Sequence, residues 1–405
     1  MNSAPDIVYY TLFPWDMPYS SVSLSLTAEL AKTSRVFYVN HPYTFKDVVT
    51  RMGEPLTKKR TVAMLTGKTI YEEIPGHPSV TGVQPPAVLP INWLSGGPTF
   101  NSLYEWNRKR VLGSIRELLS KHRLRNFIYL NCYNPYYAGI LPKGYGQLIN
   151  IYQCIDDMEE ETYTARHGAR LEREVIKDAD LVLTTSRGLL KKCQAINPES
   201  HPLFNAANTA VFEEAQNRTF ERPKELKGLE GKLIGFTGNM DPHRIDYQLL
   251  LEVARRHPDK HLVLVGPLNS DEPQKIGLDK LPNVHFTGGK HISELPAYLQ
   301  HFDVVLIPFR LNKLTASIYP LKINEYLAAG KPVVSTRFSE DIQDFEKVIY
   351  LASDRDSFLA AIDRAIAEDN ESLIAQRQEE ARKNTWEERA RQFWKLVEGK
   401  IAVKN

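Results

Sequence analysis

Lys322 and Glu325 stand three residues apart in residues 319–335, Tyr-Pro-Leu-Lys-Ile-Asn-Glu-Tyr-Leu-Ala-Ala-Gly-Lys-Pro-Val-Val-Ser. The pattern predicts a helix that begins beside Pro320 and ends at Gly330, because proline fits a first helical turn and glycine often follows a last one. The spacing puts the cation and the carboxylate on one face near the helix N-terminus, where free N–H groups favour phosphate. The pair could hold a diphosphate and a ribose, or could form an ordinary surface salt bridge.

Asp156 and Asp157 form a pair of adjacent carboxylates directly after the predicted strand 148–153. Neighbouring carboxylates repel each other, which can raise the pKa of one of them toward a value suited to a general base. Aspartate is also a frequent helix N-cap. We therefore expect one of the two to cap and the other, preferably Asp157, to accept a proton from a hydroxyl group. Asp16, in the aromatic segment 13–19, is a second choice for the base.

Gly238 and Asn239 directly follow the predicted strand 233–237. Glycine at a strand end lets backbone N–H groups approach a diphosphate closely. The segment is not a complete GxGxxG motif, so it could equally be a simple tight turn. Arg244, at the start of the next predicted helix, could bind phosphate or remain solvated.

The composition excludes some classes of function. Of 405 residues, 42% are hydrophobic and 25% charged, as in ordinary globular proteins, and the length favours two domains. The 51 basic and 49 acidic residues give a net charge of +2, which argues against a dedicated nucleic-acid binder. Cys132, Cys154 and Cys193 are far apart, which predicts buried thiols in a reducing compartment rather than metal ligands.

The sequence predicts neither a membrane span nor a secretory signal. No apolar run reaches the roughly 20 residues that cross a bilayer. Residues 1–6 lack the basic and apolar regions of a signal peptide. We therefore expect a cytoplasmic protein, with peripheral membrane contact left open.

Short β-branched runs alternate with amphipathic helical segments, which predicts parallel sheets covered by helices. We expect two doubly wound α/β domains, residues 1–213 and 233–384, joined by the charged linker 214–232 and followed by a helix in 385–405. Residues 41–100 are rich in proline and glycine and predict strands and loops. The predicted strands are 7–10, 36–39, 127–130, 148–153, 181–185, 233–237, 261–265, 284–286, 304–307, 333–335 and 348–351, and the predicted helices are 22–32, 104–122, 171–179, 188–194, 247–256, 293–299, 321–329, 355–368 and 385–394.

The pattern Pro-Leu-Lys-x-x-Glu-Tyr-Leu-Ala-x-Gly-Lys-Pro-Val-Val resembles the donor-site helix of GT-B glycosyltransferases, which move a sugar from a nucleotide diphosphate sugar to an acceptor. The resemblance implies two Rossmann-like domains facing a central cleft, with the last helix crossing back to the first domain. It places Lys322 and the backbone around Gly238 at the diphosphate and Glu325 at the ribose. His291 would flank the nucleobase without a chemical role, and Tyr319 could contact the nucleotide or pack.

Ser317 departs from the pattern of the large retaining branch of these enzymes, which has a Glu eight positions before the second Glu, here Glu325. A retaining outcome is therefore not implied. Asp156 and Asp157 instead resemble the catalytic aspartate position of an inverting glucuronosyltransferase of xanthan synthesis. Paired aspartates bind metal in the other glycosyltransferase fold, but the alternating pattern argues against that fold, so we expect no required metal or other cofactor.

The implied partners are a UDP- or GDP-sugar donor and a saccharide or polyprenyl-linked acceptor of cell-envelope polysaccharide synthesis. Aromatic and basic residues in 93–125 could touch an anionic membrane, although a solvated basic helix face is the plainer alternative. Two other functions stay open. One is a sugar-nucleotide epimerase of the same fold, and the other is a nucleotide-sugar binding protein without turnover, suggested by the missing Glu.

Overall fold

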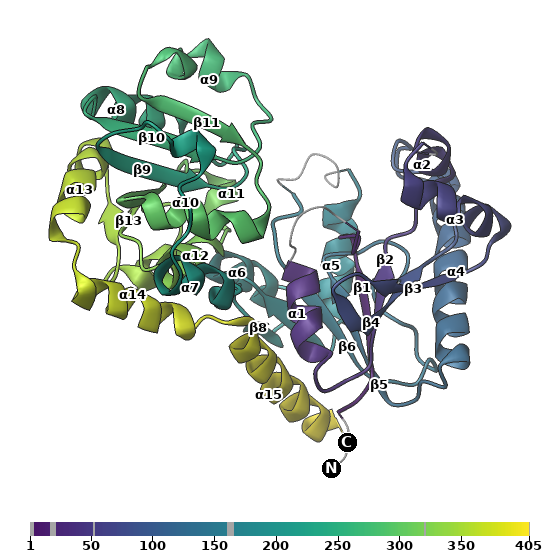
Figure 1. Ribbon diagram of the computed structural model, residues 1–405. Helices are drawn as coiled ribbons and strands as arrows, with labels where there is room; N and C mark the ends of the chain where they lie inside the picture. The colour runs from purple at the N-terminus through teal and green to yellow at the C-terminus, as the bar shows by residue number, and fades with distance from the viewer. Residues whose placement is uncertain (1–3, 17–21, 52, 160–165, 320, 405) are drawn as a thin grey trace. The chain divides into compact units, whose positions relative to one another are not determined.

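The computed structural model describes residues 4–16, 22–51, 53–159, 166–319 and 321–404. The predicted helix start at Pro320 and parts of two predicted segments, 17–19 and 160–161, lie outside the described residues. The chain divides into two compact units (Figure 1). Unit 1 comprises residues 1–185, 189–203 and 390–405, and unit 2 comprises residues 186–188 and 204–389.

Unit 1 contains an eight-stranded sheet in the order β3-β4-β2-β1-β5-β6-β7-β8. Every neighbouring pair is parallel except β3 and β4, which form an antiparallel hairpin. The central strands are buried along their length, as expected for a parallel sheet covered on both faces. The strands are β1 (Ile7–Thr11), β2 (Val36–Asn40), β3 (Ile70–Ile74), β4 (His77–Gln84), β5 (Phe127–Cys132), β6 (Gln147–Cys154), β7 (Leu181–Thr184) and β8 (Ser200–Pro202).

The helices that begin in the first half of the chain include two that the sequence did not predict, both in the segment 41–100. Helix α2 is only six residues long and begins at a capping box in which Thr44 and Asp47 bond each other's backbone N–H groups. Helix α3 exposes Val62, so it lacks a clear apolar stripe. The helices are α1 (Val22–Leu30), α2 (Phe45–Thr50), α3 (Pro55–Thr66), α4 (Pro98–Lys121), α5 (Gly168–Asp178) and α6 (Arg187–Gln194).

Unit 2 contains a six-stranded, fully parallel sheet in the order β11-β10-β9-β12-β13-β14. Helices α8 and α13 contact each other and the sheet, while α7, α10, α12 and α14 form a second group of mutually packed helices (Figure 1). The strands are β9 (Lys232–Thr237), β10 (Lys260–Val265), β11 (Val284–Gly288), β12 (Val304–Ile307), β13 (Val333–Thr336) and β14 (Tyr350–Ala352), and the helices are α7 (Thr209–Asn217), α8 (Tyr247–Arg256), α9 (Glu272–Lys275), α10 (Leu295–His301), α11 (Lys313–Ala316), α12 (Leu321–Ala328), α13 (Arg355–Glu368), α14 (Glu371–Arg382) and α15 (Trp386–Lys404).

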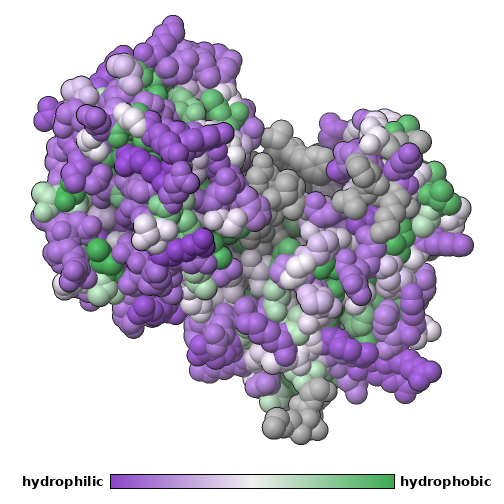
Figure 2. Space-filling model, viewed as in Figure 1, coloured by the Kyte–Doolittle hydropathy of each residue, from purple (hydrophilic) through white to green (hydrophobic). Residues whose placement is uncertain are grey.

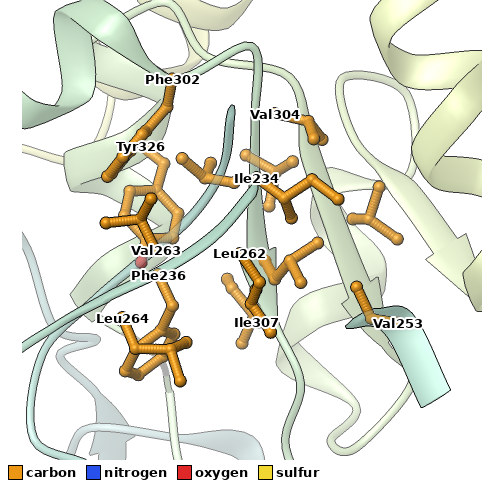
Figure 3. Packing of buried hydrophobic residues seen from close by; sticks show 14 of the residues in the cluster. Ile234, Phe236, Val253, Leu262, Val263, Leu264, Phe302, Val304, Ile307 and Tyr326 are labelled. Atoms are coloured by element: carbon orange, nitrogen blue, oxygen red, sulfur yellow. The ribbon is translucent and has the colours of Figure 1, made fainter. Parts of the chain in front are cut away.

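The core of unit 2 is built from branched and aromatic side chains on both faces of this sheet. Ile234 of β9, Leu262 of β10 and Val304 of β12 pack together with neighbours from the covering helices, among them Tyr326 of α12 (Figure 3). These side chains are almost fully buried. The two-domain α/β fold that the sequence predicts is confirmed, and each predicted strand is present with ends within two residues of the expected ones.

Unit 2 begins at residue 204, before the predicted linker 214–232. Helix α7 lies on α12, and Gln216 donates a hydrogen bond to the carbonyl of Ala329 (2.9 Å). Phe212 and Leu226 are fully buried in the core of unit 2. Because the apolar residues here are few and widely spaced among charges, the segment has no readable period, although it packs firmly.

Helix α15 confirms the predicted return of the last helix to the first domain. Its first turn belongs to unit 2, whereas residues 390–405 belong to unit 1. Within unit 1, the ammonium of Lys400 pairs with Glu199 (2.7 Å) and that of Lys404 with Asp180 (2.8 Å).

Candidate functional site

Helix α12 is held from its C-terminal end. Arg377 of α14, a buried side chain, donates to the carbonyl of Gly330 (3.0 Å) and pairs with Asp369 (2.6 Å). A cation at a helix C-terminus is favoured by the helix dipole. Because α12 runs between two parallel strands, β12 and β13, its N-terminus lies at the carboxyl edge of the sheet, where ligands bind in folds of this kind.

Tyr326 fixes α12 against the end of β9. The backbone N–H of Thr237 donates to the Tyr326 hydroxyl (2.9 Å), and this hydroxyl faces the Thr237 carbonyl (3.3 Å). Burial raises the pKa of Tyr326. A buried tyrosine thus sets the distance between the helix and the loop that follows β9.

Gly238 brings this loop against Lys322. It adopts a φ of 135°, a left-handed conformation that favours glycine, and its N–H donates to the carbonyl of Val265 (2.7 Å). A methyl group added at Gly238 would collide with Cε and Nζ of Lys322. The lysine side chain therefore crosses the backbone of this glycine, with Nζ 5.9 Å from the ring centre of Phe236.

Lys322 and Glu325 are both half-buried, yet they do not form the salt bridge that the sequence left open. No ion pair within 4.0 Å and no hydrogen bond joins either side chain to a described residue. Burial lowers the pKa of Lys322, the carboxylate of Glu325 partly opposes this, and the charge of Arg244 adds to the lowering. Burial raises the pKa of Glu325, and Lys322 partly opposes this. The site therefore keeps a cation and an anion partly desolvated, and neither has an ion pair or a hydrogen bond with a described residue.

Arg244 and Asn239 occupy the loop between β9 and α8. The guanidinium Nε of Arg244 lies 3.6 Å from a carboxylate oxygen of Asp241, and its charge acts on Lys322. Asn239 is exposed, and its side-chain oxygen accepts from Asn269 (3.4 Å). Arg244 is thus brought close to Lys322, while Asn239 stays at the rim of the loop.

His291 is exposed and caps the short 3-10 helix η3 (Ile292–Glu294). Its Nδ1 lies 2.8 Å from the hydroxyl of Ser293, and its N–H donates to the carboxylate of Glu294 (2.8 Å). These contacts give His291 a structural role, and its position beside the nucleobase stays a prediction.

Glu225 holds the loop after β11, a role that the sequence analysis missed. Its carboxylate accepts from the Lys290 ammonium (2.6 Å) and from the Tyr298 hydroxyl (2.7 Å). Partial burial raises the pKa of Glu225, but these two hydrogen bonds outweigh burial and lower it to about 2. An isolated glutamate in an aperiodic charged segment gave no signal in the sequence.

Ser317 and Tyr319 lie between α11 and α12. The Ser317 hydroxyl donates to the Lys313 carbonyl (3.3 Å). Tyr319 is buried, stacks on Phe204 (centroids 5.8 Å apart) and accepts a hydrogen bond from Asn324 (3.2 Å). Of the two alternatives for Tyr319, the structure places its ring in the core.

In unit 1, Asp156 and Asp157 follow the end of β6, as predicted, and both are half-buried. One oxygen of Asp157, Oδ1, accepts from the backbone N–H of Glu159 (3.1 Å) and from the Lys192 ammonium (2.7 Å). Asp157 therefore caps the turn, so the expectation that the base is the aspartate that does not cap and the preference for Asp157 as base cannot both hold. Its Oδ2 has no hydrogen bond to a described residue, so an anchored carboxylate keeps one oxygen available.

Glu172 of α5 is a buried carboxylate behind this turn that the sequence analysis missed. It accepts from the Tyr152 hydroxyl (2.7 Å) and from the Cys154 thiol (3.5 Å). Burial raises the pKa of Glu172 to about 7, although the hydrogen bond from Tyr152 and the charge of Lys192 oppose this. The signal was available, because Glu172 stands within the apolar stripe of α5 beside Leu171.

Asp16, the second choice for a base, is engaged by a buried arginine. Arg60 donates to Asp16 (2.7 Å) and to Glu72 (2.5 Å), and its guanidinium lies 5.0 Å from the ring centre of Trp15. These contacts tie down the segment after β1, so Asp16 acts there as a structural anion.

A metal site and a membrane-spanning helix are two further features that a sequence of this length could hold. Within the described ranges, no group of three or more His, Cys, Asp or Glu side chains is arranged to hold a metal ion. In the same part of the chain, every helix is too short or too polar to cross a bilayer.

The chain is similar to glycosyltransferases in sequence. The family model described as "Glycosyl transferases group 1" matches residues 231–368, within unit 2. TuaH of Bacillus subtilis, named as a teichuronic acid biosynthesis glycosyltransferase, is 29% identical over 266 residues, which cover 61% of this chain and 66% of TuaH. The match thus spans slightly less than two thirds of that relative.

Solved structures share the fold over nearly the whole chain. Sucrose-phosphate synthase from Thermosynechococcus elongatus has a TM-score of 0.67 and 16% identity, covering 98% of this chain and 100% of that chain. Anabaena HepE in complex with UDP has a TM-score of 0.65 and 14% identity, covering 97% and 100% respectively. At such low identities the similarity establishes the GT-B fold rather than the reaction.

Because Lys322 and Glu325 are desolvated without partners, we expect the protein to become more stable when both charges are removed. Replacing both charges, with Lys322→Met and Glu325→Gln in one variant, should raise the free energy of unfolding of unit 2 by about 1 kcal/mol at pH 7, measured by urea denaturation, because two desolvated and unpaired charges disappear. The part of the gain that comes from Glu325 should shrink as the pH falls from the raised pKa of the folded state to 4.5, the ordinary pKa of a glutamate, because below 4.5 Glu325 is protonated in both folded and unfolded states.

The matched control replaces a pair of the same types and spacing that is paired and more exposed. Lys383 and Glu380 form an ion pair of 2.8 Å, and changing Lys383→Met with Glu380→Gln should alter stability by less than about 0.5 kcal/mol. A loss of stability in the Lys322 and Glu325 variant would contradict this account of the site.

Proposed function

We propose that this chain, whose residues 231–368 match the group 1 glycosyltransferase model and which shares the GT-B fold, transfers a sugar from a nucleotide diphosphate sugar to a saccharide acceptor. The observation that carries the proposal is the unpaired Lys322 and Glu325 at the N-terminal end of α12, beside the bare backbone of Gly238. A fold of this kind supports many reactions, so the proposed function is inferred from the residues of the donor site and not from the fold.

In the proposed donor site, two charged side chains bind different parts of the nucleotide sugar. The Lys322 ammonium binds the diphosphate and stabilises the negative charge that develops on it as the sugar leaves. Arg244 adds positive charge on the same side. Glu325 accepts hydrogen bonds from the ribose hydroxyls. The absence of a side chain at Gly238 leaves the space that the Lys322 side chain occupies, so the ammonium can lie against the backbone of the loop.

The proposed donor is a UDP-sugar, and the proposed context is cell-envelope polysaccharide synthesis. HepE, which shares the fold, was solved with UDP, and TuaH is named for teichuronic acid biosynthesis. Lys322 would neutralise the leaving diphosphate, a task that a divalent ion performs in other enzymes, so we propose transfer without a required metal.

Asp157 is the proposed general base of unit 1, with Asp156 as the alternative. Lys192 and the Glu159 N–H hold one oxygen of Asp157, which orients the carboxylate, and the other oxygen is available to take the acceptor's proton. Such a base belongs to an inverting transfer, in agreement with the serine at position 317.

Substitution of Gly238 tests the donor site. Gly238→Ala should weaken UDP binding about 10- to 100-fold by calorimetry, because the methyl group displaces the Lys322 ammonium from its charge-assisted contact with phosphate. UDP release from UDP-sugars, followed with a chelator present, should fall in parallel.

Gly277→Ala is the matched control, because Gly277 also has a positive φ (74°) but no atom within 4 Å of the added methyl group. Equal UDP affinity in the two variants would contradict the donor site. An epimerised sugar nucleotide without UDP release would identify an epimerase, and binding without either product would identify a binding protein.

Substitution of the aspartates tests the base. Asp157→Asn should lower kcat at least about 100-fold with UDP affinity unchanged, because a general base typically contributes that much. Asp156→Asn, read in the same assay, is the comparison. If both variants turn over normally with the acceptor, the base lies elsewhere.

A membrane-facing surface on α2 and α3 is the proposed route to a polyprenyl-linked acceptor. Val49, Val62 and Leu65 are 65%, 72% and 46% exposed, and hydrophobic atoms gather where these helices reach the surface (Figure 2). Lys58 of α3 and Lys68, two residues after that helix, are also exposed. Exposed apolar side chains with lysines near them in the sequence suit a bilayer with anionic headgroups.

Vesicle flotation tests this surface. The protein should float with vesicles that contain phosphatidylglycerol and remain unbound with pure phosphatidylcholine, and the double variant Val62→Glu with Leu65→Glu should lose the binding. Leu311→Glu, at a 68% exposed leucine of unit 2, is the control and should float as the unmodified protein does. Flotation of the double variant at the unmodified level would contradict the surface.

A further inference from the structure

His41 and Asn134 meet at the carboxyl edge of the sheet of unit 1. His41 directly follows β2, and Asn134 comes two residues after β5. These strands lie on either side of β1, so the two side chains come together over the end of that strand. His41 Nδ1 lies 3.2 Å from Asn134 Oδ1.

Asn134 is fully buried and held rigidly. Its N–H donates to Asn131 Oδ1 (3.0 Å), and its carbonyl accepts from Asn131 Nδ2 (2.8 Å). Its own amide nitrogen, Nδ2, meets the geometry of a hydrogen bond with no described residue, although the Asn134 side chain lies close enough to the Tyr10 hydroxyl to act on the pKa of that tyrosine. A buried donor left without a partner is costly, and a bound ligand can supply the missing oxygen.

The contact with Asn134 sets the tautomer of His41. A side-chain amide oxygen only accepts, so the proton of the imidazole is on Nδ1 and the lone pair is on Nε2. No described residue hydrogen-bonds to Nε2. The ring is half-buried and packs against Tyr136 and Tyr137, each with its ring centre 5.8 Å away.

The surroundings keep this imidazole neutral. Burial lowers the pKa of His41 to about 4, although the hydrogen bond with Asn134 and the charge of Asp47 partly oppose this. Tyr136 and Tyr137, which face the ring, are uncharged at neutral pH. With a neutral acceptor, a neutral donor and no hydrogen bond or ion pair from a cation of the described residues to His41 or Asn134, the place suits hydroxyl groups rather than phosphate.

We propose that His41 and Asn134 form a hydroxyl-binding pair for the saccharide acceptor, in which Nε2 accepts from one sugar hydroxyl and Nδ2 donates to a neighbouring sugar oxygen. The inference rests on the proposed transferase function and adds a substrate class to unit 1, namely an uncharged sugar. Tyr136 and Tyr137 hold the imidazole in place.

Saturation-transfer NMR with methyl glycosides of common hexoses and N-acetylhexosamines tests the pair, beside UDP calorimetry on the same samples. His41→Phe keeps a ring but loses the acceptor atom, so glycoside binding should weaken about tenfold, the effect of one hydrogen bond, with UDP affinity unchanged. His41→Gln restores an acceptor oxygen and should bind nearly as the unmodified protein does. His201→Phe, at a half-buried histidine of β8, is the matched control.

Nitrogen NMR of the imidazole should show an unprotonated Nε2 between pH 6 and 8. Glycoside binding unaffected by His41→Phe, no glycoside binding by the unmodified protein, or a proton on Nε2 would each overturn the pair. Failure of UDP binding in the unmodified protein would instead overturn the donor assignment, so the two failures are distinguishable.

Discussion

A lysine without a partner at the start of α12 is the constraint on which the donor half of this structure depends. Lys322 loses much of its hydration against the backbone of Gly238, and the charge of Glu325 offsets this only in part, without an ion pair or hydrogen bond between them. Most buried charges in proteins are paired. The desolvation penalty of an unpaired charge is offset when an ion of opposite charge binds. A diphosphate carries the negative charge that would offset the penalty of Lys322 at this helix N-terminus.

The surrounding elements keep that lysine where it is. Arg377 and Gln216 satisfy carbonyls at the far end of α12, and Tyr326 fixes the helix to the end of β9. None of these three residues is proposed to contact the ligand. These stabilising contacts lie at the C-terminal part of the helix. Its N-terminal end is therefore held in place while the space proposed for the ligand stays open.

The proposed acceptor side uses another principle. Asp157 is oriented by Lys192, and His41 is oriented by Asn134, so in each case one atom of a side chain is held and another is left for substrate. Donor binding thus relies on charge, whereas the proposed hydroxyl-binding pair His41 and Asn134 relies on neutral hydrogen-bonding groups. This division matches the chemistry of a charged nucleotide and an uncharged sugar.

The sequence by itself determined the alternating α/β architecture, the strand positions and the helix that carries Lys322 and Glu325, because these rest on local periodicity and on proline and glycine signals. It could not decide whether that pair was satisfied, which depends on how Gly238, distant in sequence, approaches the lysine. It also could not find α7, whose few buried residues have no period, or the meeting of His41 with Asn134, 93 residues apart. Only tertiary packing sets those distances, since burial and pairing arise from neighbours that the local sequence does not contain.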